Sequence, residues 1–320
     1  MTIRTTPLRL LAVACVGLVL AALSACSASD EAEGTARSAG AQPLAIAANF
    51  YPIEWLAARV GGEVVSVTGL TPVGEEPHDL ALTAQSRQAL EDSAVTFYLG
   101  SGFQPDVEKA VEELSGSTTA VDLLAAPGVN LLDAPADLGK ESLAGNKDPH
   151  VWLDPTLMAA MANQIAKTLT ERAPEHGDTF AANRDALVAA LSELDGQLGT
   201  ALASCSIDTI VTSHAAFNYL AQRYGLTQIA ITGISPEDQP DPATLEQIAA
   251  DAKAAGVTTV FFEDQLPADL SETVAAEIGA SVDLLSALEF DPAETIGAGQ
   301  DYLTVMADNG TRLAKGLQCS

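Results

Sequence analysis

Basic side chains are scarce in this chain of 320 residues, which has 15 lysines and arginines against 43 aspartates and glutamates. The formal net charge at pH 7 is therefore −28. Because phosphate groups are bound by clustered lysine and arginine side chains, this balance excludes nucleic acid as a partner. Most of the carboxylates are expected to form a solvated acidic shell, although such a surface also attracts cations to a cleft.

Several catalytic motifs are also missing. The sequence contains no HExxH, no GxSxG, no P-loop and no GxGxxG after its first predicted strand. These motifs place a general base beside a metal, expose a nucleophile or hold a phosphate group. Their absence argues against the hydrolases and nucleotide-dependent enzymes that depend on them.

The N-terminal segment predicts export. Arg4 and Arg9 precede a continuous apolar run over residues 10–23, and small residues lead from this run to Cys26. The run is short for a membrane span, and its end fits cleavage with lipid attachment at Cys26. We therefore expect a lipoprotein signal peptide over residues 1–25 and a lipidated flexible tether over residues 26–43. A retained transmembrane anchor is the alternative.

Only four cysteines are present, and two of them, Cys15 and Cys26, lie in this N-terminal segment. The other two, Cys205 and Cys319, are a possible pair, and an exported setting permits a disulfide between them. A thiolate metal site is the weaker alternative, because zinc ribbons use closely spaced cysteine pairs.

The remaining chain alternates short apolar runs with amphipathic stretches, which predicts an α/β fold of βα units with mainly parallel sheets. The pattern occurs twice and indicates two (βα)4-type lobes, over residues 44–174 and 204–320, each with its own core. The predicted strands lie near residues 44–49, 64–70, 95–100 and 118–124, and near 208–214, 228–234, 257–264 and 280–285. The predicted helices lie near residues 54–60, 82–91 and 104–114, and near 215–224, 242–255 and 268–278.

A helical region without strand signals separates the two halves. Asp154 and Pro155 predict a capped helix start, and apolar residues then recur at helical spacing from Met158 to Leu169. A second apolar stripe predicts a linker helix over residues 175–203, about 40 Å long at about 1.5 Å per residue. A long rigid backbone helix of this kind would join the lobes and limit hinge motion.

Three of the four histidines occupy corresponding places. His214 directly follows a predicted strand, His78 lies in a turn-rich loop after another, and His150 opens the helical region. Because ligands bind beyond the carboxyl ends of parallel strands, these imidazoles are expected to converge on one transition-metal ion between the lobes. His176, at a predicted helix start, is expected to be exposed.

The same residues carry a family resemblance that covers residues 44–319. The chain resembles the metal-binding lipoproteins of ABC importers for zinc and manganese, the zinc-uptake or cluster A-I type of substrate-binding protein. The motifs that carry it are EPHDL (76–80), NKDPHVWLDP (146–155), IVTSHAAFNYLAQRYGL (210–226), VTTVFFED (257–264) and LLSALE (284–289). The resemblance implies two α/β lobes joined by a long helix, with a metal ion buried between them.

The resemblance places the first three metal ligands on His78, His150 and His214. An imidazole at the third position favours zinc, because manganese carriers tend to have a carboxylate there, so manganese or iron is the alternative. The fourth ligand of the family is an aspartate, which aligns with Ser286 in this sequence. We leave the fourth position open between a water molecule and three carboxylates of the chain, Asp283, Glu263 and Glu76.

The implied function is capture of Zn²⁺ as cargo and its delivery to an ABC permease and its ATPase. The protein would be a monomer, anchored through its N-terminal lipid to the extracytoplasmic face of the cell membrane, and would not be an enzyme. Two alternatives remain: a surface adhesin, and a zinc hydrolase in which water completes a three-histidine site.

Overall fold

The structure is a computed structural model that describes residues 42–114, 116, 118–134, 146–237 and 239–320. The predicted signal peptide, the predicted lipidation site at Cys26 and residues 26–41 of the predicted tether lie outside the described residues. Within the described ranges, no helix combines the length and the apolar character that a membrane span requires.

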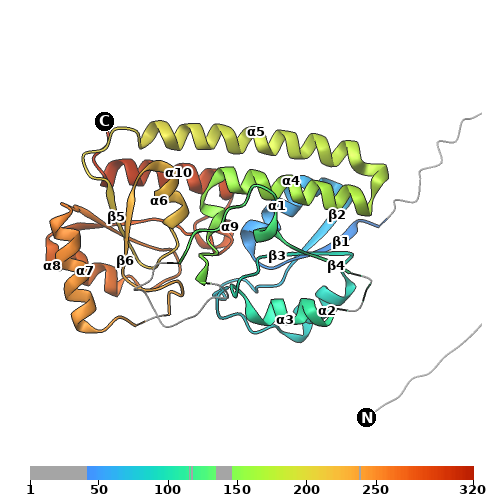
Figure 1. The fold of residues 1–320 in the computed structure, drawn as a ribbon, viewed down its shortest axis with the longest axis horizontal. Coiled ribbons are helices and arrows are strands. Elements are labelled where there is room, and N and C mark those ends of the chain that lie inside the picture. The colour runs from blue at the N-terminus through green and yellow to red at the C-terminus, as the bar shows by residue number, and fades with distance from the viewer. Residues whose placement is uncertain (1–41, 115, 117, 135–145, 238) are drawn as a thin grey trace, which may run out of the picture. The chain divides into compact units, whose positions relative to one another are not determined.

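The N-terminal lobe is built on a sheet of four parallel strands in the order β2-β1-β3-β4. Short apolar segments form these strands, and amphipathic helices between them cover the sheet (Figure 1). The elements are β1 (Leu44–Ala48), α1 (Tyr51–Gly61), η1 (Gly62–Val64), β2 (Val65–Gly69), α2 (Ala84–Asp92), β3 (Val95–Tyr98), α3 (Pro105–Glu113), β4 (Thr119–Asp122) and η2 (Leu123–Ala125).

The C-terminal lobe repeats this topology, because its four parallel strands follow the order β6-β5-β7-β8. The two lobes therefore confirm the predicted α/β fold with parallel sheets. The elements are β5 (Thr209–Thr212), α6 (Asn218–Tyr224), β6 (Thr227–Ala230), α7 (Pro242–Ala254), β7 (Thr259–Phe262), α8 (Asp269–Ile278), β8 (Ser281–Leu284), α9 (Pro292–Thr295) and α10 (Tyr302–Gly316).

Two long helices connect the lobes. After η4 (Val151–Leu153), α4 (Pro155–Arg172) begins at the predicted cap, where the Asp154 side chain accepts a hydrogen bond from the main-chain N–H of Thr156. The short η5 (Pro174–His176) leads into α5 (Gly177–Ala201), whose 25 residues span about 37 Å at about 1.5 Å per residue. Helix α5 packs against α1 and α4 of one half and α10 of the other, so it runs along both lobes (Figure 1).

The apolar core differs from the two separate cores that the sequence predicts. The largest cluster of buried side chains is continuous through both lobes, since α5 contributes to it along its whole length. Three smaller clusters of the described residues are separate from it. The predicted boundaries at residues 174 and 204 stay predictions. The buried residues of α5 are Phe180, Leu187, Leu191, Leu194 and Leu198.

The connection into α5 corrects one prediction. His176 is half-buried rather than exposed, because it lies at the residue before α5 and its ring is 6.2 Å from that of Phe180, centroid to centroid.

A disulfide joins Cys205, just before β5, to Cys319, just after α10. Replacing both cysteines with serine is expected to lower the free energy of unfolding by roughly 2–4 kcal/mol, because the bond closes a long loop in the unfolded chain. Urea unfolding of the oxidised protein and the double variant measures this difference. An unchanged unfolding midpoint would show that the bond contributes nothing to stability.

Candidate metal centre

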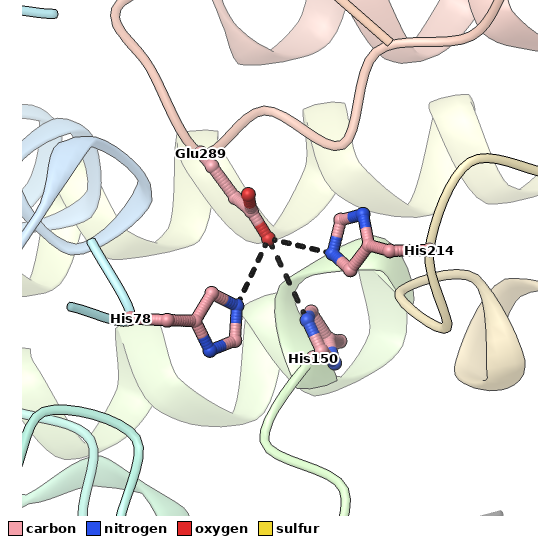
Figure 2. A group of neighbouring side chains, drawn as sticks. All are labelled: His78, His150, His214 and Glu289. Carbon is pink, nitrogen blue, oxygen red and sulfur yellow. Dashed lines mark hydrogen bonds and ion pairs between the residues drawn. The ribbon is translucent and has the colours of Figure 1, made fainter. Parts of the chain in front are cut away.

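Four side chains from four separate segments converge at one point between the lobes (Figure 2). His78 lies in the loop between β2 and α2, and His150 immediately precedes η4. His214 follows β5 by two residues, and Glu289 lies in the segment between β8 and α9. The structure thus brings together the three histidines that the sequence analysis selected, and it adds a carboxylate that the analysis missed.

The carboxylate of Glu289 stands opposite all three imidazoles. Its Oε1 atom lies 3.4 Å from Nε2 of His78, 3.5 Å from Nε2 of His150 and 3.2 Å from Nε2 of His214. The four ligand atoms lie within 4.8 Å of one another. The closest pairs correspond to the edges of a tetrahedron, because ligand atoms bound at 2.0–2.1 Å to a central zinc ion are about 3.3 Å apart.

The four groups are removed from solvent. The side chains of His150 and His214 are fully buried, and those of Glu289 and His78 are 1% and 4% exposed. Nε2 of His150 lies within ion-pair distance of Glu289 but makes no hydrogen bond within the described part of the chain. A buried nitrogen without a hydrogen bond raises the free energy of the folded protein unless a ligand binds to it. The residues present therefore fit a bound cation.

Two further carboxylates orient the imidazole rings from behind. Oδ1 of Asp148 lies 2.8 Å from Nδ1 of His150, and Oε1 of Glu263 lies 2.8 Å from Nδ1 of His214. Each therefore accepts a hydrogen bond from the Nδ1–H group and leaves Nε2 of the same ring available to a metal ion. Asp154, the other aspartate next to His150 in the sequence, instead caps α4, as the sequence predicts.

The surrounding charges set different protonation equilibria for the three imidazoles. Burial lowers the pKa of His78 below 6.5, and the Glu289 carboxylate only partly opposes it. Burial acts the same way on His214, but Glu263 and Glu289 outweigh it and raise the pKa of His214 well above 6.5. The pKa of His150 is also raised, because Asp148 outweighs the effect of burial. Burial favours the neutral form of Glu289, yet the nearby imidazoles hold its pKa well below 4.5.

The groups proposed from the sequence for the fourth position lie elsewhere. Asp283 forms an ion pair with Arg312 on α10, and Glu263 contacts the far side of the His214 ring. Glu76 accepts a hydrogen bond from the main-chain N–H of Asp79. Ser286, at the position of the family aspartate, is buried, and its hydroxyl accepts a hydrogen bond from the N–H of Leu288. The carboxylate that lies with the three histidines is that of Glu289.

Aromatic rings close one side of the centre. The Trp152 ring is fully buried, with its centroid 5.0 Å from that of His150, and the Phe103 ring lies 4.7 Å from that of His78. Trp152 belongs to the apolar core and also contacts a histidine of the cluster, so the core reaches the metal centre at this side.

The profile of the family described as "ZnuA: Zinc-uptake complex component A periplasmic" matches residues 46–316. The chain belongs to the ZnuA family. The zinc-binding lipoprotein AdcA of Streptococcus pneumoniae is 31% identical over 304 residues, which cover 92% of this ZnuA-family chain and 59% of AdcA. The chain thus spans less than two thirds of the length of that relative.

Solved structures agree with this assignment to the ZnuA family. The Zn(II)-bound ZnuA-like domain of S. pneumoniae AdcA superposes with a TM-score of 0.73 at 30% identity, over 86% of this chain and 99% of that one. The laminin-binding protein Lmb of Streptococcus agalactiae, described as a bifunctional adhesin and metal transporter, gives a TM-score of 0.75 at 27% identity, over 86% and 100% of the two chains. These likenesses confirm the two-lobed fold and the family resemblance of the sequence.

Proposed function

We propose that this chain captures one Zn²⁺ ion between its lobes and delivers it to an ABC permease for import. The observation that carries this proposal is the buried group of His78, His150, His214 and Glu289, whose ligand atoms have the spacing of a tetrahedral site. Membership of a zinc-uptake family and the zinc-bound AdcA domain of the same fold support it.

The donor set favours zinc over manganese. Three imidazole nitrogens and one carboxylate oxygen suit a borderline metal with tetrahedral preference, whereas manganese prefers oxygen donors in octahedral geometry. In the metal-free protein the Glu289 carboxylate balances imidazolium charge. When Zn²⁺ binds, the same carboxylate cancels half of the charge of the ion, which lowers the free-energy cost of burying it.

A binding role explains this site better than catalysis does. Catalytic zinc keeps an open position for water or substrate, whereas four protein groups here are available for the four positions of a tetrahedral ion. We therefore infer that the ion is cargo and that the chain is not an enzyme. An adhesin role, which the description of Lmb raises, has no residue of this chain that specifically favours it.

Delivery implies partners and a location outside the cytoplasm. We infer that a permease and its ATPase receive the ion, that the protein acts as a monomer, and that a lipid at Cys26 anchors it to the extracytoplasmic face of the membrane. AdcA is named a lipoprotein, which supports the anchor. Deleting the gene would then reduce cellular zinc accumulation, whereas a pure adhesin would affect attachment alone.

Elemental analysis of the chain without residues 1–26 tests the metal site. We expect one zinc ion per chain, and a zinc-induced stabilisation of about 2.7 kcal/mol when free zinc is a hundredfold above the dissociation constant. His214→Ala should lose the bound ion and most of this stabilisation. His176→Ala is the matched control and should keep both, because His176 lies at the start of α5, outside the cluster. A chain that binds no zinc, or binds it equally well in the His214 variant, would refute the proposal.

A further inference from the structure

A tyrosine hydroxyl from the C-terminal lobe joins two segments beside the metal centre. Tyr219, on α6, accepts a hydrogen bond of 2.9 Å from the main-chain N–H of Leu132 and donates one of 2.7 Å to the carbonyl of Asp148. Leu132 and Asp148 also share a direct bond of 3.0 Å, from the N–H of Asp148 to the carbonyl of Leu132. The segments around Asp133 and Lys147 form an antiparallel bridge with a second backbone bond of 3.0 Å, from the N–H of Ala134 to the carbonyl of Asn146. The Tyr219 hydroxyl extends this bridge at the end next to His150, where it bonds both Leu132 and Asp148.

This pairing holds the main chain of Asp148, whose side chain orients the imidazole of His150. Asp148 is fully buried, and its Oδ1 accepts hydrogen bonds from the main-chain N–H of His150 at 2.9 Å and from the ring Nδ1 at 2.8 Å. Burial raises the pKa of Tyr219, so its hydroxyl remains a neutral donor. The position of the His150 ring therefore depends on Asp148, and the Tyr219 hydroxyl holds the main-chain carbonyl of Asp148 beside the backbone bridge.

The other end of the same segment is tied to the loop that carries Glu289. Nε1 of Trp152 donates a hydrogen bond of 2.7 Å to the carbonyl of Ala287, two residues before Glu289. The hydroxyl of Tyr302 donates a hydrogen bond of 2.7 Å to the carbonyl of Trp152. The Trp152 ring also packs against Phe50 of the N-terminal lobe, 4.7 Å between centroids. Hydrogen bonds are more directional than ring packing. The bond from Trp152 to Ala287 therefore determines how the segment around Trp152 is placed against the loop that carries Glu289.

We propose that Tyr219 and Trp152 are positioning residues of the metal centre, which place the His150 ring and the Glu289 carboxylate for the ion before it binds. Neither side chain belongs to the four-residue cluster itself, so each acts through a ligand. This inference rests on the proposed function, since it assumes that the cluster binds zinc. It adds that the affinity depends on hydrogen bonds from two aromatic side chains outside the cluster.

Tyr219→Phe removes the hydroxyl and keeps the ring. Removing outer partners of metal ligands lowers metal affinity by about 10–100-fold, and we expect a loss of this order in zinc competition titrations. Tyr224→Phe is the matched control, because Tyr224 lies on the same helix and its hydroxyl bonds Asp195 rather than the centre. Both variants should lower the melting temperature of the metal-free protein by similar small amounts, and only Tyr219→Phe should weaken zinc binding.

The visible spectrum of bound Co²⁺ provides a readout that stability alone does not change. Displacement of the His150 ring in Tyr219→Phe should reduce the intense absorption of a tetrahedral cobalt site, and Tyr224→Phe should leave it intact. Trp152→Phe should resemble Tyr219→Phe. The double variant should lose less affinity than the product of the two single losses, because both bonds hold the segment 148–152.

The possible failures are distinguishable. A wild-type chain that binds neither zinc nor cobalt would refute the proposed function and this inference with it. Wild-type binding of zinc, together with unchanged affinity and an unchanged cobalt spectrum in Tyr219→Phe and Trp152→Phe, would overturn the positioning role alone. An equal loss of affinity in Tyr219→Phe and Tyr224→Phe would also overturn it, since the effect would then be one of general stability.

Discussion

Replacing Glu289 with glutamine is expected to lower the zinc affinity of the chain by more than about a hundredfold, which exceeds the effect typical of outer partners. The substitution keeps the shape of the side chain but removes the only negative charge among the four groups of the cluster. Zinc would then be buried with three neutral imidazoles and an amide oxygen, which neither cancels its charge nor donates as strongly. Competition titration against a chelator of known affinity measures the difference.

Two variants separate this effect from a general loss of charge. Asp283→Asn also removes a carboxylate from the segment around β8, but Asp283 pairs with Arg312 and should leave the zinc affinity within about twofold of wild type. Glu263→Gln should give an intermediate loss of about 10–100-fold, because Glu263 orients the His214 ring without belonging to the cluster. If Asp283→Asn weakened zinc binding as much as Glu289→Gln, the assignment of the fourth ligand would be wrong.

The fold could be predicted to a large extent because its signals are local. Alternation of apolar strands with amphipathic helices occurs twice in the chain, and the structure has a four-stranded parallel sheet for each occurrence. The cap at Asp154 likewise depends on adjacent residues. Helix α10 was not predicted, although Asp301 and Thr304 form a capping box at its start. The continuous core was not predicted either, because it depends on how α5 packs against both lobes.

A residue of the metal centre could be predicted from the sequence only where it closely follows a predicted strand, because the end of the strand then gives its place in the fold. His214 follows a parallel strand by two residues, so the edge of the sheet locates it. Glu289 lies five residues beyond β8, and the intervening Leu288 has a left-handed backbone with φ of 57°. That turn brings residue 289 to the centre and leaves Ser286 buried beside Asn309. The family resemblance places the fourth ligand at Ser286, whereas the LLSALE motif has its carboxylate three residues later, at Glu289. That carboxylate is the sequence signal for the residue that completes the cluster.

Zinc affinity should fall steeply as the pH is lowered, because the ion must displace protons from the imidazoles. Glu263 and Glu289 raise the pKa of His214 well above 6.5, and Asp148 raises that of His150. These raised pKa values favour the imidazolium form in the metal-free centre, and zinc binding converts it to a neutral ligand. Below both pKa values two protons are displaced, so affinity should fall by up to about a hundredfold per pH unit.

The stability of the metal-free protein should have the opposite pH dependence. His150 and His214 have folded-state pKa values above the unfolded value of 6.5, so their contribution to stability is complete below that value and is lost as the pH rises through the folded pKa values. Glu76 acts in the same direction, because burial and the Glu289 charge raise its pKa to about 8. The melting temperature without zinc should therefore fall between about pH 6.5 and 8, while the zinc-induced shift grows.

Calorimetric titration at several pH values, in buffers with different ionisation enthalpies, counts the protons released when zinc binds. We expect more than one proton per ion near pH 6 and fewer as the pH rises above the pKa values of the imidazoles. Glu76→Gln removes the nearby carboxyl group that titrates in the same range and should leave at least one released proton, since His214 retains both of its carboxylate partners. Zinc affinity that stayed constant between pH 5.5 and 7.5 would contradict coordination by these histidines, because neutral imidazole is the form that binds the metal.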